Sequence, residues 1–176
     1  MSADPAPLPD RITAKLPVID AERAARLRER LGGDVFAAWG DGAAFLDAVF
    51  AASPYLGRLA SQRPELLTRL AKEPPEAICA EAEAAARSAG QLDGEDAVAE
   101  ALREAKQAMH LAAALADLAG AWSVAELTGA VTRFADAVCQ GAFQAAARSH
   151  GFPDQEAGGR GPVPGVFVLA LGKHGA

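Results

Sequence analysis

The chain has 176 residues, of which 51% are hydrophobic and only 6% aromatic, and its formal net charge is −6. This length can bury one sizeable core, and the many alanines with few aromatic residues favour close-packed helices over sheets. The acidic balance argues against a general nucleic-acid binder, because phosphate binding requires a basic excess. We expect no nucleic-acid partner, and we interpret the charged residues as solvated helix faces.

The sequence was next searched for a secretory signal, a membrane span and paired cysteines. The first ten residues, MSADPAPLPD, contain neither the basic nor the apolar segment of a secretory signal. No stretch is expected to cross a membrane; Lys106 and Asp117 bracket the longest candidate. Cys79 and Cys139 stand far apart without a CxxC pattern, which predicts buried free thiols rather than a disulfide or a metal site. These observations predict a cytoplasmic protein with no membrane partner.

Capping residues divide the first half of the chain into short helices. The predicted helices cover residues 20–31 and 42–52, a short segment that begins at Ser53-Pro54, and residues 64–72 and 75–88. Asp20 and Ser53 are suited to be N-caps, and Gly32-Gly33 is expected to end the first helix. Their predicted apolar stripes are Phe45, Val49 and Ala52 in one helix and Tyr55, Leu56, Leu59 and Ala60 in the next. Short helices with proline starts favour a bent, orthogonal packing over an up-and-down bundle.

Two long helices follow. Residues 94–119 contain neither proline nor an internal glycine, and Gly120 supplies the stop. Ser123 and Glu126 form a capping-box pattern that opens the next helix, which Gly151 and Pro153 end. The predicted stripes are Val98, Leu102, Ala105, Met109, Ala112 and Ala116, widened by Leu111, Leu115 and Leu118, and then Leu127, Val131, Phe134, Val138, Ala142 and Ala145. The short connection predicts an antiparallel αα-hairpin with helices about 40 Å long.

The end of the sequence changes character. We predict a helical region over residues 1–156, a linker rich in Gly and Pro over 157–164, and a strand with a glycine turn over 165–176. The apolar run 166–171 has the composition of a strand buried on both faces, which needs neighbours on both sides. The fold class is therefore mainly α, with one C-terminal β-strand that begins a truncated α/β core.

Few side chains suggest chemistry by themselves. The turn GKHG after the apolar run has the position of a phosphate loop but lacks the Walker A pattern, so a simple turn is equally consistent with it. Asp117 either pairs with an arginine or contacts a later domain. His110 is predicted to be a half-buried structural histidine, and Trp39 and Trp122 are predicted to be core anchors.

The hairpin and the terminal strand together resemble a known family. The segment LREAKQAMHLAAALADLAGAWSVAELTGAVTRFADAV, followed by VFVLALGKHGA, is similar to glutamine synthetase adenylyltransferase, a bifunctional bacterial enzyme, and SPYLGRLASQRPELLTRL is similar to its amino-terminal helical region. The chain departs from the family where His174 stands in place of leucine and Ala170-Leu171 in place of Gly-Met. A further departure is MHLA at residues 109–112, where the family has an arginine and an aromatic residue.

This resemblance implies a function for the whole enzyme. It places the chain in the amino-terminal, adenylyl-removing half, which removes AMP from a tyrosine of glutamine synthetase with phosphate and releases ADP. Gly172, Lys173, Gly175 and Ala176 match the nucleotide-binding glycine turn, while the Asp-x-Asp pair that holds Mg²⁺ would follow Ala176, so the fragment itself should lack activity. The implied cofactors are Mg²⁺ and ATP or ADP.

The resemblance also names partners, and one alternative stays open. The implied partners are glutamine synthetase and a nitrogen-signalling regulatory protein. The alternative is a non-catalytic helical module that docks on a protein partner and adds its C-terminal strand to the edge of the partner's sheet.

Overall fold

The computed structural model describes residues 5–152, and this part of the chain is helical, with no strand. Its α-helices are α1 (Ala21–Leu31), α2 (Gly33–Trp39), α3 (Ala43–Ala52), α4 (Pro54–Gln62), α5 (Pro64–Leu70), α6 (Pro75–Ser88), α7 (Glu95–Leu118) and α8 (Val124–Ser149). Short 3-10 turns occupy Leu8–Arg11, Gly40–Gly42 and Ala89–Gln91. The predicted linker, the terminal strand and the glycine turn with Gly172, Lys173, Gly175 and Ala176 lie outside the described residues.

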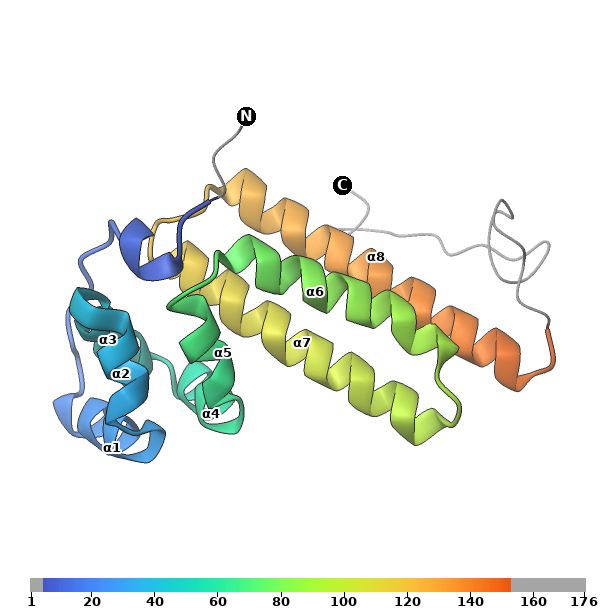
Figure 1. The fold of residues 1–176 in the computed structure, drawn as a ribbon, viewed down its shortest axis with the longest axis horizontal. Helices are drawn as coiled ribbons and strands as arrows, with labels where there is room; N and C mark the ends of the chain where they lie inside the picture. The colour runs from blue at the N-terminus through green and yellow to red at the C-terminus, as the bar shows by residue number, and fades with distance from the viewer. Residues whose placement is uncertain (1–4, 153–176) are drawn as a thin grey trace.

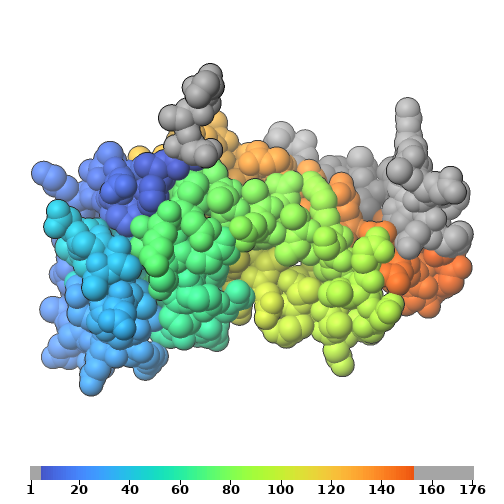
Figure 2. All heavy atoms as spheres, in the orientation of Figure 1, coloured from blue at the N-terminus to red at the C-terminus, as the bar shows by residue number. Residues whose placement is uncertain are grey.

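The helices form two groups. Helices α6, α7 and α8 lie side by side as a long layer, and α1 to α5 pack at one end of it, near the α7–α8 turn (Figure 1). Helices α7 and α8 are antiparallel and joined by a short turn, which confirms the predicted hairpin (Figure 1). In the space-filling view the two groups make one elongated body, with α1 to α3 at one end and the end of α8 at the other (Figure 2). The bent arrangement of the short helices is also as predicted.

Local capping chemistry explains where the helices begin. The Asp20 side chain accepts a hydrogen bond from the backbone N–H of Arg23 at 2.8 Å, and Ser53 accepts one from Leu56 at 3.2 Å. Ser123 and Glu126 form both bonds of a capping box at the start of α8. These contacts satisfy backbone donors that have no partner inside the helix, so three N-cap predictions are confirmed.

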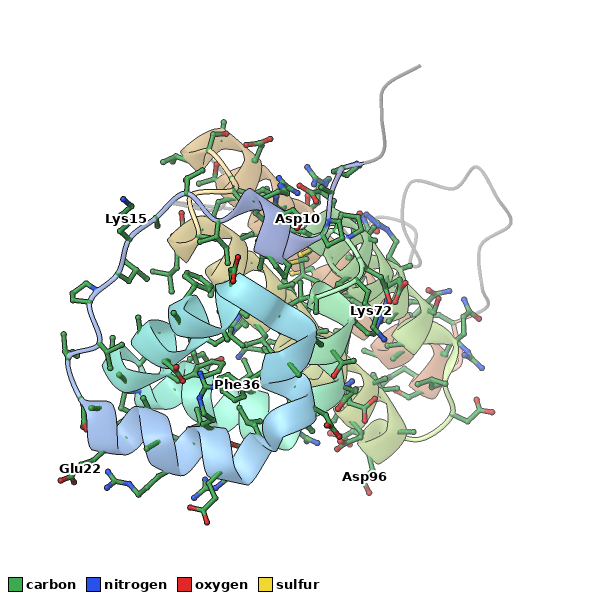
Figure 3. All side chains as sticks on the ribbon, turned by 60° about the vertical axis from the view of Figure 1, so that its left-hand side comes forward. Asp10, Lys15, Glu22, Phe36, Lys72 and Asp96 are labelled. Carbon is green, nitrogen blue, oxygen red and sulfur yellow. The ribbon has the colours of Figure 1, made fainter. Side chains whose placement is uncertain are left out.

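The core is apolar and shared by the two groups of helices. Both tryptophans are buried, as expected of core anchors, and Trp39 donates from Nε1 to the carbonyl of Leu67 at 2.8 Å. Phe36 lies among α1 to α3, with the Arg28 guanidinium 4.1 Å from its ring centre (Figure 3). Glu22 and Asp96 point away from the protein (Figure 3). In each tryptophan the ring is buried and the indole N–H has a hydrogen-bond acceptor, the carbonyl of Leu67 for Trp39 and the carboxylate of Glu76 for Trp122.

Helix α2 was not predicted from the sequence, because Gly32-Gly33 was interpreted only as the end of α1. Gly32 does end α1, with φ of +86°, but a new helix starts at the next residue. The backbone of Gly32 adopts a left-handed region that other residues avoid, and this turns the chain sharply between two helices.

Several residues predicted to lie on buried stripes are exposed. They are Ala52, Tyr55, Leu118, Val131 and Ala142. In α8 the buried line is Ala130, Phe134, Ala137 and Gly141, because this face meets α6. Helix α8 has apolar residues on more than one side, so its sequence alone does not specify which side the core takes. Cys139 is also exposed, so its predicted burial was wrong, whereas Cys79 is buried.

One stretch, Gly33–Ala52, passes a test of length and composition for crossing a membrane, so the best candidate by that test is not the segment between Lys106 and Asp117 named from the sequence. The same test is passed by core helices of soluble proteins, and 56% of this window is buried inside the protein. The 3-10 turn Gly40–Gly42 divides it into α2 and α3. Two short helices packed against others account for its composition.

Candidate functional site

The best-defined polar site among the described residues lies where the N-terminal segment meets the α7–α8 turn. We call residues 8–14 the strap. Its backbone donates from Thr13 and Ala14 to the carbonyl of Ala119, at 2.9 and 3.1 Å. Figure 3 shows the strap, marked by Asp10, running over the ends of the helices. The strap thus joins the start of the chain to the middle of the hairpin.

Glu76, in the first turn of α6, is the centre of this site. Arg11 of the strap donates from Nη1 to both carboxylate oxygens, at 2.9 and 2.8 Å, and from Nη2 to the carbonyl of Ala121. The indole of Trp122 donates to Glu76 Oε1 at 2.5 Å. Burial by itself would raise the pKa of Glu76, but the hydrogen bonds from Arg11 and Trp122 outweigh burial and hold this pKa below its usual value.

A cavity of about 270 Å³ opens beside Glu76, between α6, α7 and α8. Its walls include Cys79 and Glu83 of α6, Met109 of α7, and Glu126 and Arg133 of α8. Arg133 lies 3.5 Å from Glu83, and Glu126 is held by Ser123 in the capping box. The charged groups of the cavity therefore already have partners within the protein.

This arrangement does not support nucleophilic or metal-assisted chemistry. Burial, reinforced by the charge of Glu76, raises the pKa of the Cys79 thiol to about 12, so the thiolate is scarce at neutral pH. Among residues 5–152 no group of three or more His, Cys, Asp and Glu side chains could hold a metal ion. The site works as a polar joint between the strap, α6 and the hairpin.

Two other residues singled out in the sequence have different outcomes. His110 is half-buried, and its Nδ1 lies 2.8 Å from the hydroxyl of Tyr55, so it has the structural role predicted for it. Burial and the charge of Lys106 lower the pKa of His110. Asp117 is exposed and makes no ion pair within the described part of the chain, so its predicted arginine partner is not found there. Sequence patterns did not indicate the Arg11–Glu76–Trp122 site, because its members are far apart in the chain.

Comparison with known proteins identifies the family. A family model described as glutamate-ammonia ligase adenylyltransferase matches residues 44–176. Proteins named bifunctional glutamine synthetase adenylyltransferase/adenylyl-removing enzyme are similar over most of the chain. The one from Caulobacter vibrioides is 41% identical over 181 residues, which cover 96% of this chain and 18% of that protein. The one from Rhodopseudomonas palustris is 35% identical, over 91% of this chain and 17% of the relative.

A third relative, from Brucella suis, is 32% identical over 96% of this chain and 18% of its own length. The chain thus spans less than a fifth of the length of these relatives. No solved structure matches it significantly. Because the family model covers well over half of the sequence, the chain belongs to the glutamate-ammonia ligase adenylyltransferase family.

Proposed function

We propose that this chain is the amino-terminal part of the adenylyl-removing half of a bifunctional enzyme that acts on glutamine synthetase. The observation that carries the proposal is the similarity to the Caulobacter vibrioides enzyme over 96% of the chain. In this proposal the whole enzyme works in the cytoplasm and controls nitrogen assimilation by adding AMP to, and removing it from, a tyrosine of glutamine synthetase. A nitrogen-signalling regulatory protein is its second expected partner.

The helical body contributes no catalytic group to this proposal. Its cavity beside Glu76 is lined by paired charges, and residues 5–152 hold no cluster of metal ligands. The proposed nucleotide contacts are those of the terminal glycine turn, Gly172, Lys173, Gly175 and Ala176, where backbone N–H groups would approach the phosphates. The family's nucleotidyl transfer requires Mg²⁺, and residues 5–152 do not offer a set of side chains that could hold this ion. The carboxylates that hold it are therefore expected after Ala176.

The test measures phosphate-dependent release of ADP from adenylylated glutamine synthetase. The longer polypeptide encoded by the same gene should release ADP, and the 176-residue chain alone should not. Replacing Gly175 with valine in the longer polypeptide should strongly lower the release, while its helical circular dichroism stays unchanged. Release by the 176-residue chain itself would refute the assignment of the catalytic carboxylates. A longer polypeptide without this activity would refute the adenylyl-removing assignment.

A further inference from the structure

One apolar line of the hairpin is only partly covered by the described helices, since Val138 packs against the core while Val124 and Val131 are exposed. Val124, Val131, Val138 and Ala145 follow one line along α8, because seven residues complete nearly two helical turns. This line differs from the buried line through Phe134 and Gly141, which meets α6. Val124 is 74% exposed and Val131 is 46% exposed. A valine stripe of this spacing is typical of a helix face that packs against something.

Toward the end of α8 this line runs into a groove of about 580 Å³ between the two helices of the hairpin. The groove is lined mainly by apolar side chains, Val98 and Leu102 from α7 and Ala142, Ala145 and Ala146 from α8. We call the groove together with the valine line the α7/α8 trough. Its polar lining includes Arg148, which pairs with Asp93 at 3.0 Å.

The position of the groove indicates what occupies it. Ser149 and His150, at the end of α8, also line the groove, so the chain leaves the helix beside the groove. Phe152, the last described residue, is 46% exposed. The sequence then continues through a polar segment to the apolar run VFVLAL at 166–171. Residues 153–165, which we call the tether, therefore connect the end of α8, beside the apolar groove, to an apolar segment of the same chain.

The tether is long enough for the apolar run to reach either end of α8. Residues 153–165 can extend to about 45 Å. Helix α8, with 26 residues, is about 39 Å long. The apolar run can thus be laid against any part of the trough without moving a helix.

We propose that the α7/α8 trough is the docking surface for the apolar run 166–171 of this same chain. Burial of the run removes apolar surface from water on both sides of the contact. The proposal goes beyond the function proposed above and needs only the described hairpin and the sequence of the run.

Disulfide trapping in the full 176-residue chain tests this proposal. Cys139→Ser first removes the exposed thiol, while Cys79 stays buried. Ala142→Cys places a thiol in the trough, and the control Gln140→Cys places one two residues away, on the opposite side of α8, with nearly the same tether. Each is combined with Val168→Cys or with Leu169→Cys, whose side chains point in opposite directions in an extended segment. Residues 140 and 142 are both exposed, so neither change removes a buried contact.

A disulfide requires Cβ atoms within about 4.5 Å, so the rate of trapping reports which face the run visits. The variants that carry Ala142→Cys should form the disulfide several-fold faster than the variants that carry Gln140→Cys. Adding Ala145→Arg inside the trough should reduce the faster rate to that of the control, whereas Thr132→Arg outside it should not. Equal rates for 142 and 140, or no effect of Ala145→Arg, would overturn the proposal.

Discussion

A Cβ atom on Gly141 would lie 2.1 Å from the carbonyl oxygen of Ala86, so glycine is what allows α8 to touch α6 at this point. The approach is mutual, since a Cβ on Gly90 would lie 2.9 Å from the carbonyl oxygen of Gly141. These two glycines bring the end of α6 against the second half of α8 with backbone in contact with backbone. No side-chain rotation can relieve a clash at Gly141, because the obstructing atoms are the main-chain atoms of Ala86.

We therefore expect Gly141→Ala to destabilise the protein by about 1–3 kcal/mol, as for other insertions into packed contacts. Gly129→Ala is the matched control in the same helix, since its Cβ would meet only the end of the Arg133 side chain, at 3.3 Å. That control should be neutral or stabilising by up to about 1 kcal/mol, because alanine is the better helix former. Urea titrations followed by circular dichroism measure both values. A harmless Gly141→Ala would show that the two helices are not this close.

The buried line of α8 gives a second prediction. Phe134→Ala should lower the free energy of unfolding by about 3–5 kcal/mol, because the ring is buried among α8's neighbours. Val131→Ala and Arg133→Ala should each change it by less than about 0.5 kcal/mol. Val131 is exposed, and the Arg133–Glu83 pair is a long contact near the surface. Equal effects of Phe134→Ala and Val131→Ala would mean that the wrong face is assigned to the core.

Glu76 predicts a dependence of stability on pH. Its native pKa lies below the ordinary value of 4.5, so the ionised carboxylate is favoured in the folded state. The resulting stability is fully present above the unfolded pKa and is lost as the pH falls through the lowered native pKa. Glu76→Gln removes this contribution, so the mutant should be less stable than the wild type at pH 7. The difference in urea midpoints should shrink as the pH falls below 4.5, and a difference independent of pH would refute the ionic role.

The two thiols should react very differently. Cys139 is exposed, so it should react with a thiol reagent in the folded protein. Cys79 is buried and its pKa is raised to about 12, so it should react only after unfolding. Counting modified thiols by mass spectrometry, with and without denaturant, checks both. Cys139→Ser should abolish the fast reaction, whereas rapid modification of Cys79 in native conditions would contradict the packing of α6.

The predicted boundary near residue 157 is tested by truncation. A chain of residues 1–156 should keep its helical circular dichroism and a cooperative thermal transition, because the described caps and core lie before Gly151. The full 176-residue chain is the reference. A large loss of helix on truncation would show that the terminal residues are part of the helical core.

Features set by neighbouring residues could be predicted from the sequence, and features set by distant ones could not. Asp20, Ser53 and Ser123 were identified as N-caps because a cap bonds to a backbone group only two or three residues away. The choice between Val131 and Phe134 for the core depends on where α6 lies, which no local pattern contains. The Arg11–Glu76 pair joins residues 65 positions apart and follows from no motif. The nucleotide-binding turn was inferred from family resemblance, and it stays a prediction.

The strap has a consequence for the order in which the protein folds. The Thr13 hydroxyl and the Ala119 carbonyl that it contacts are separated by 106 positions in the sequence. Closing so long a loop costs entropy that local helix formation does not, and the hairpin turn must exist before the strap can bind it. During synthesis the strap therefore cannot form these contacts until the turn after α7 has emerged from the ribosome.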